Sequence, residues 1–81
     1  MIICGIDPGT RATGYGVLEI GNVSRGSLTY VAHGVIRPRA EGLDSRLKEI
    51  FVKATEIFQR YQPIEIAVEA TFHALNIQSA F

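Results

Sequence analysis

The chain has 81 residues, which is enough for one small domain and too few for several. Hydrophobic residues make up 47% of it and charged residues 20%, a composition that excludes a disordered tail, a collagen-like fibre and a disulfide-rich scaffold. Eight basic and eight acidic residues give a formal net charge of zero. Any contact with DNA must therefore come from a local basic patch or from protein outside this chain.

The only cysteine, Cys4, cannot form a disulfide within the chain, and no zinc-ligand spacing surrounds it. We expect it to be a small buried hydrophobic residue in a reducing compartment. The apolar run at residues 1–6 is interrupted by Asp7 and Pro8 and lacks the length and basic flank of a signal peptide. No later run is long enough to cross a bilayer, so a soluble cytoplasmic protein without a membrane partner is expected.

Three strands are predicted in the first 36 residues. Residues 2–6 are apolar at consecutive positions, which is typical of a strand buried on both faces, and a turn follows at residues 7–10, Asp-Pro-Gly-Thr. Residues 13–20 and 28–36 are rich in β-branched and aromatic residues and are separated by a flexible stretch at residues 24–27. The short connections predict a three-stranded antiparallel meander.

An amphipathic helix is predicted from residue 43 to residue 61, because apolar residues recur there at helical spacing and charged residues fill the other face. Asp44 or Ser45 is expected to cap its start. Glu49 and Lys53 are expected to form an i,i+4 pair, and a proline two residues past the helix marks its end.

A fourth strand is predicted at residues 64–68, which are largely apolar and end at Glu69. Residues 74–81 have the pattern of the first turns of a second helix, and no cap, glycine or proline closes them. We therefore expect the chain to be truncated within that second helix.

The crossover through the helix makes the fourth strand parallel to the first and third strands. The third strand mixes Thr29 and His33 with apolar residues and looks like an edge, so the fourth strand is placed beside the first. Asp7 and Glu69 then lie side by side at the carboxyl ends of two strands, where open α/β sheets bind ligands.

Two converging carboxylates repel each other, and a hard divalent cation such as Mg²⁺ relieves the repulsion by accepting oxygen ligands from both. A two-metal site usually needs more than two carboxylates, so further ligands must come from elsewhere. Structural explanations remain open for each residue. The Asp7 side chain could accept a local backbone hydrogen bond in its turn, and Glu69 could be an ordinary exposed strand end.

Other polar and aromatic residues are weaker candidates. His33 and His73 have no partner at ligand spacing and are interpreted as surface or strand residues. Arg37 and Arg39 flank a proline in a predicted loop and either touch phosphate or are simply solvated. Phe72 either stacks on a base or packs under the second helix.

One segment of the sequence runs Gly-Ile-Asp-Pro-Gly-Thr at residues 5–10 and Thr-Gly-Tyr-Gly-Val at residues 13–17, and a second segment runs from residue 68 to residue 80. Together these segments resemble the amino-terminal half of the RuvC family of bacterial Holliday-junction resolvases. The resemblance covers essentially all of the chain. It implies an α/β, RNase H-like mixed sheet: a three-stranded antiparallel meander, a crossover helix and a fourth strand parallel to the first. Residues 1–81 would then be the amino-terminal part of a single RNase H-like nuclease domain.

The resemblance also implies an activity: metal-dependent, structure-specific cleavage of four-way DNA junctions by paired phosphodiester hydrolysis, in recombination and repair. Asp7 and Glu69 match two of the family's four catalytic, metal-binding carboxylates, and the other two lie beyond residue 81. The fragment is therefore expected to be catalytically incomplete. Phe72 matches an aromatic residue that the family places at the junction, and Asn76 and Arg11 are further DNA-binding candidates.

The implied cofactor is Mg²⁺, with two ions in each active site and Mn²⁺ as a substitute. The implied partners are four-way junction DNA, a second copy of the full-length protein in a homodimer, and the branch-migration proteins RuvA and RuvB, in a bacterial cytoplasm. One residue departs from the pattern: Leu75 stands where family members often carry a basic residue.

Three alternatives remain open on the sequence. In an actin-like or heat-shock-chaperone-like ATPase, Gly9 and Thr10 would approach phosphate and Asp7 would hold Mg²⁺ through water. Such ATPases need a second phosphate loop and do not explain the segment from residue 68 onward. A YqgF-type RNase H-like nuclease shares only the first motif. An inert RNase H-like binding module predicts that Asp7→Asn changes nothing.

Overall fold

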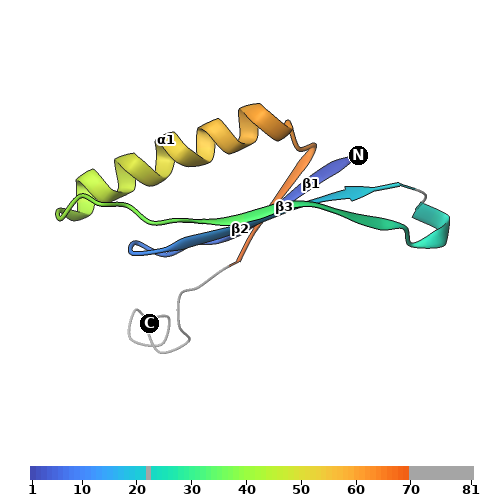
Figure 1. Ribbon diagram of the computed structural model, residues 1–81, viewed down its shortest axis with the longest axis horizontal. Coiled ribbons are helices and arrows are strands. Elements are labelled where there is room, and N and C mark those ends of the chain that lie inside the picture. Colours follow the sequence, from blue (N-terminus) through green and yellow to red (C-terminus); the bar gives the residue numbers. More distant parts are fainter. Residues whose placement is uncertain (22, 70–81) are drawn as a thin grey trace, which may run out of the picture.

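The computed structural model describes residues 1–21 and 23–69, which form a four-stranded sheet with one long helix across it (Figure 1). The predicted order of the elements is confirmed. In chain order they are β1 (Ile2–Asp7), β2 (Thr13–Ile20), the short 3-10 helix η1 (Val23–Arg25), β3 (Leu28–Ile36), α1 (Leu43–Tyr61) and β4 (Glu65–Val68).

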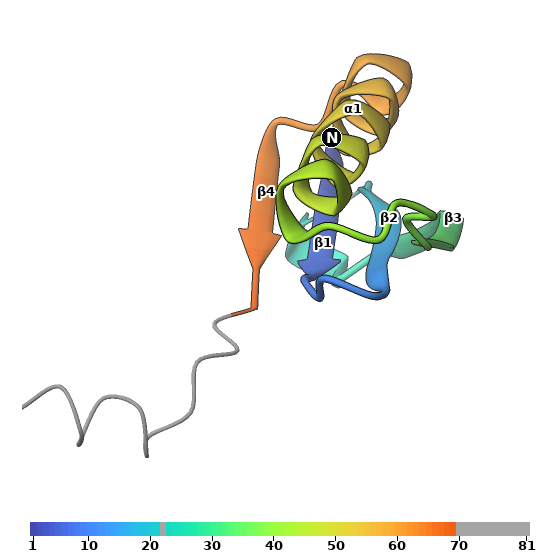
Figure 2. The same cartoon turned by 90° about the vertical axis from the view of Figure 1, so that its left-hand side faces the viewer.

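The strand order in the sheet is β3-β2-β1-β4. β1 pairs antiparallel with β2, and β2 pairs antiparallel with β3, so the predicted meander is confirmed. β4 pairs parallel with β1 at the other side of the meander, which confirms the predicted placement of the fourth strand and leaves β3 at an edge. Figure 2 shows β1 between β4 and β2, with α1 on one side of the sheet.

The face of the sheet toward α1 carries the small core of the described residues. Cys4 on β1 lies opposite Val17 on β2, and both are buried, as is Ile36 at the end of β3. Tyr15 and Ile36 line a cavity together with Ile57 of α1, which shows that the helix packs over this face. Burial raises the pKa of the Cys4 thiol, in keeping with the predicted role of this residue as a buried apolar side chain.

The opposite face of the sheet is open in the described part of the chain. Ile3 and Leu18 line a hollow of about 560 Å³ on this face with Tyr30, whose side chain is 63% exposed. The prediction that the first strand is buried on both faces is therefore wrong for the described residues: Gly5 is exposed and Ile3 only half-buried. The reason is that α1, the only long helix among residues 1–21 and 23–69, covers one face alone.

The start of α1 differs from the sequence prediction. Gly42 is the N-cap, with an extended backbone, and no side chain caps the helix. Asp44 and Ser45 lie inside the first turn, so the prediction that either one caps the helix is wrong. The Asp44 carboxylate still stabilises this end, because it lies near the positive end of the helix dipole.

The predicted Glu49–Lys53 pair does not form. The Lys53 ammonium instead lies 3.8 Å from the Glu56 carboxylate, one residue closer along the helix. Glu49 accepts hydrogen bonds from the backbone N–H groups of Arg39 and Ala40, at 2.8 and 3.1 Å. A carboxylate that accepts two backbone N–H groups is better satisfied than one in an exposed ion pair, which contributes little in water.

Turns and ends complete the fold. The stretch predicted to be flexible overlaps η1, and Gly26 after this short helix has a positive φ of 63°, a conformation that favours glycine. α1 ends at Gln62 in the left-handed conformation, where its N–H donates to the Phe58 carbonyl, and Pro63 follows as predicted. Within the part of the chain that the structure describes, no helix is long and apolar enough to cross a membrane.

Candidate functional site

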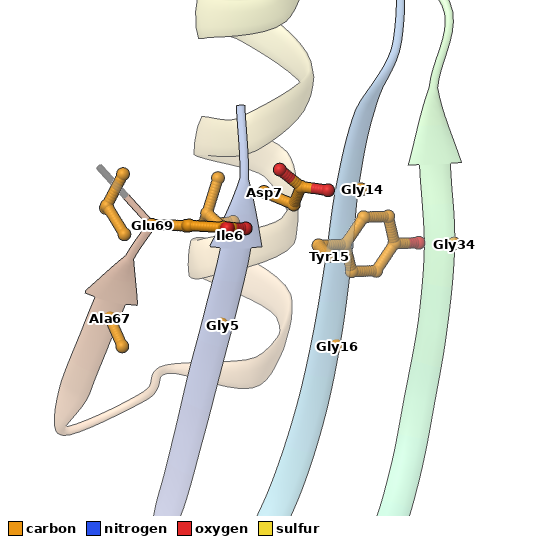
Figure 3. Close-up of a pocket in the computed structure, with 10 residues that line it drawn as sticks. Gly5, Ile6, Asp7, Gly14, Tyr15, Gly16, Gly34, Ala67 and Glu69 are labelled. Carbon is orange, nitrogen blue, oxygen red and sulfur yellow. The ribbon is translucent and has the colours of Figure 1, made fainter. Parts of the chain in front are cut away.

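The two predicted carboxylates lie at the ends of neighbouring parallel strands. Ile6 of β1 pairs with Val68 of β4, and the backbone N–H of Glu69 donates to the Ile6 carbonyl at 2.9 Å. Asp7 and Glu69 each follow one of these paired residues, and side chains alternate along a strand, so both carboxylates belong to the face opposite α1. Figure 3 shows the Glu69 side chain extending across the end of β1, where Asp7 stands.

An open pocket of about 560 Å³ lies beside these carboxylates, and its floor is made largely of small residues. A Cβ atom at Gly5 or Gly16 would meet nothing within 4 Å, and one at Gly14 would lie 3.8 Å from the Cβ of Asp7. The floor therefore leaves room for a ligand next to both acids. Sequence reasoning did not assign this role to the glycines; the signal was their alternation on β2, where Gly14 lies opposite Asp7 and Gly16 lies opposite Gly5.

A hydrogen-bonded loop joins Asp7 to β2. The buried Thr13 hydroxyl accepts a hydrogen bond from the Gly9 N–H at 3.1 Å and donates one to the Gly9 carbonyl at 2.8 Å. A side chain at Gly9 would overlap the carbonyl oxygen of Ala12, so the turn can close this tightly only with glycine at that position. The loop fixes the backbone that leaves Asp7 and presents Arg11 to solvent.

Tyr15 lies on the α1 face of the same strands. Its phenol crosses to β3, and a Cβ at Gly34 would lie 2.6 Å from the Tyr15 hydroxyl oxygen and 2.8 Å from the ring carbon that carries it (Figure 3). The ring thus covers the glycine of the neighbouring strand. This contact packs β2 against β3 behind the carboxylates.

The donor set suits a hard divalent cation. Asp7 and Glu69 supply carboxylate oxygens, the ligands that Mg²⁺ prefers, and neither forms an ion pair with another residue of the described ranges. No group of three or more potential metal-ligating side chains occurs within residues 1–21 and 23–69. Asp7 and Glu69 thus fit part of a metal site, and a complete two-metal site would need further ligands.

The remaining candidates divide into two groups. The first group lies within the described residues. Its three arginines are exposed: Arg11, Arg37 and Arg39. His33 lies on the open face, away from the carboxylates, where its Nδ1 shares a hydrogen bond of 2.9 Å with the Tyr30 hydroxyl. The predicted second helix, His73 and the DNA-binding candidates Phe72 and Asn76 lie outside the described residues.

Comparisons with known proteins place this chain in a family. The family model for the crossover junction endodeoxyribonuclease RuvC matches residues 3–81. The RuvC protein of Citrobacter koseri is 49% identical over 79 residues, and that of a Shewanella species is 47% identical over the same length, each alignment covering 98% of this chain and 44% of the relative.

Solved structures agree. The Thermus thermophilus RuvC structure superposes with a TM-score of 0.79 at 27% identity, covering 91% of this chain and 45% of that one. The structure of T. thermophilus RuvC in complex with a Holliday junction substrate superposes with a TM-score of 0.78 at 26% identity, covering 99% of this chain and 51% of that one. The sheet and its crossover helix are therefore those of an RNase H-like fold. The chain spans about half the length of the relatives it matches, and it belongs to the RuvC family of crossover junction endodeoxyribonucleases.

Proposed function

We propose that the gene product containing this chain is a metal-dependent endonuclease that resolves four-way DNA junctions by paired phosphodiester hydrolysis. The observation that carries the proposal is the placement of Asp7 and Glu69 on one face at the ends of two paired strands, beside an open pocket. Family membership supports the same activity, and a relative has been solved with a Holliday junction substrate. These observations favour the nuclease over the ATPase and the inert module.

In this proposal Asp7 and Glu69 hold Mg²⁺, with two ions in each site and Mn²⁺ as a substitute. Bound divalent ions supply Lewis-acid stabilisation of the phosphate oxygens and a water of lowered pKa. The chain's own contribution is positional. β1 and β4 fix the two carboxylates by a direct backbone hydrogen bond between their strands, and the glycine floor leaves space for the substrate phosphate. Because strand pairing already fixes the backbone at both residues, no ordering of that backbone is needed during the reaction.

Paired nicks in opposed strands require two active sites, so we propose a homodimer as the working form. The RuvA and RuvB branch-migration proteins are its proposed partners, in the bacterial cytoplasm. Phe72 would stack on a base at the junction, and Asn76 and Arg11 would contact DNA. Arg11 is the one of these three within the described residues, and its exposed position in the loop after Asp7 supports the assignment.

The test is cleavage of a mobile four-way junction in the presence of Mg²⁺, with linear duplex of the same sequence as the control substrate. The complete gene product is compared with its Asp7→Asn and Glu69→Gln variants. A direct ligand should matter more than the supporting groups around a metal, whose loss typically costs about 10- to 100-fold, so each variant should lose about 100-fold or more.

Glu65→Gln is the matched control. Glu65 is the first residue of β4, beside Ile3, and lies on the same face as Glu69, which follows the last residue of that strand. Glu65→Gln removes one negative charge, as Glu69→Gln does, but leaves the site unchanged, so this variant should cleave junctions at the wild-type rate. Equal losses in Glu65→Gln and Glu69→Gln, or junction cleavage that survives Asp7→Asn, would contradict the proposal.

A further inference from the structure

A second pocket, of about 400 Å³, lies between the β1–β2 loop and the connection from β3 to α1. Both segments lie at the same end of the molecule in Figure 1, where the start of α1 approaches the loop that follows β1. Three arginines line this pocket, Arg11 from the first loop, Arg39 from the connection and Arg46 from the first turns of α1. We call these three residues the arginine cluster.

Hydrogen bonds fix both backbone segments that carry the arginine cluster. The Glu49 carboxylate accepts hydrogen bonds from the N–H groups of Arg39 and Ala40, which ties the β3–α1 connection to α1. Both oxygens of this carboxylate therefore bind backbone N–H groups and not an arginine side chain. The hydrogen bonds between Thr13 and Gly9 close the loop that carries Arg11. The cluster therefore stands on two anchored segments, unlike arginines on an unsupported loop.

Arg46 is held in place while part of its guanidinium group is unsatisfied. Its Nη1 donates to the Glu41 carbonyl oxygen, but its Nε is buried and has no hydrogen-bond partner among the described residues. A buried N–H without a partner is costly, and in native structures it usually identifies a place where water, an ion or a ligand binds. The Nε group therefore indicates an acceptor that the described residues do not supply.

The charge of the pocket points to an anion. Three arginines face one acidic side chain, that of Glu41, and none of the three arginines forms an ion pair within residues 1–21 and 23–69. Guanidinium groups match the geometry of phosphate oxygens through paired N–H donors, which makes arginine the preferred residue for such sites. Three residues separate Arg11 from Asp7 along the loop that follows β1, so the pocket lies at the same end of the sheet as the carboxylates.

We propose that the arginine cluster binds a backbone phosphate of the DNA strand that enters the carboxylate site. This inference rests on the proposed nuclease function and adds a specific phosphate subsite to it. The subsite orients the strand without reading its sequence, because phosphate contacts set position and carry no direct base information. It also explains how a chain of zero net charge contributes to DNA binding, through local charge at one end of the sheet.

Binding and cleavage are measured separately to test the subsite. The complete gene product in an Asp7→Asn background, without divalent metal, is titrated with a fluorescent four-way DNA junction between about 50 and 200 mM KCl. Arg39→Gln and Arg11→Gln are the test variants, alone and combined. Arg25→Gln is the matched control, because Arg25 is exposed and lies in η1, at the far end of the β2–β3 hairpin. Arg46 is left intact because it also holds the start of α1.

One neutralised phosphate contributes about 0.9 to the slope of log affinity against log salt, and the arginines of the cluster share one phosphate, so the double variant should reduce the slope by about 1 and each single variant by less. Over a fourfold change in salt, one such contact changes affinity about 3.5-fold. Arg25→Gln should retain the wild-type slope. Thermal unfolding of each variant verifies that the fold is intact.

The outcomes separate the subsite from the proposed function. Reduced slopes in the two test variants, with Arg25→Gln unchanged, support the subsite. If the protein with wild-type Asp7 cleaves junctions but the salt slopes of the test variants are unchanged, the subsite is overturned and the nuclease proposal stands. A cluster that binds an acidic protein partner predicts this result. A protein that binds no DNA in any form would overturn both.

Discussion

Thr13→Val is the most informative single change in the loop that follows Asp7. Valine has nearly the same shape as threonine but has no hydroxyl group, so it removes both hydrogen bonds to Gly9 while the buried volume is kept. A buried backbone group left without a partner costs about 1–3 kcal/mol, and here an N–H and a carbonyl lose theirs together. Gly9 is only half-buried and water can reach it in part, so we expect a total loss of about 2 kcal/mol in the free energy of unfolding.

Thr13→Ser is the matched control, because serine keeps the hydroxyl and loses one methyl group, worth about 0.8 kcal/mol when buried. Urea unfolding of the complete gene product measures both variants. The valine variant should also lose junction cleavage at fixed Mg²⁺, because the backbone leaving Asp7 is released, and higher Mg²⁺ should restore part of that loss. Equal stability and equal cleavage of the two variants would refute the role assigned to the hydroxyl.

Three further predictions concern packing around the site. Glu49→Gln keeps one amide oxygen for the two N–H groups of the β3–α1 connection and should lower the free energy of unfolding by about 1–2 kcal/mol, measured in urea. Gly34→Ala places a Cβ against Tyr15 and should destabilise the protein by about 1–3 kcal/mol. Tyr15→Phe should not relieve this cost, because two Tyr15 ring carbons also lie within 2.9 Å of the added Cβ. Tyr15→Val should relieve it, and a double-mutant cycle measures the coupling between the two positions. Cys4 is 2% exposed and its pKa is raised by burial, so its thiolate population at pH 8 is lower than that of a free cysteine. It should resist iodoacetamide in the folded protein and react on unfolding, as peptide mass spectrometry would show; rapid labelling of the folded protein would contradict its burial.

The order of the elements and the sheet topology were predictable because each depends on periodicity or chain connectivity. The change from a strand pattern to helical spacing at Leu43 located α1, and the crossover rule with an apolar first strand placed β4 beside β1. The proximity of Asp7 and Glu69 followed from that topology. The topology alone therefore brings both residues to the same end of the sheet.

What sequence reasoning missed depends on contacts between distant segments. Helical spacing made Lys53 the natural partner of Glu49, but Glu49 binds backbone groups nine and ten residues earlier in the chain. Spacing within a helix identifies only neighbours on that helix. The apolar residues of the first strand predict that both of its faces are covered. Whether a face is covered depends instead on which elements pack against it, and an apolar sequence does not specify those elements.

The pairing of β1 with β4 also has a consequence for the folding pathway. Asp7 and Glu69 are 62 residues apart in the chain, and they meet only through the parallel pairing that follows α1. Closing a loop of this length costs about 3.5 kcal/mol of chain entropy beyond a constant, so β4 should join the sheet after the local hairpins have formed. A nascent chain that has completed only the meander has one of these two acids and does not assemble the pair. Under the proposed function, metal binding would therefore require that the parallel strand has docked, and it would stabilise that late step by mass action.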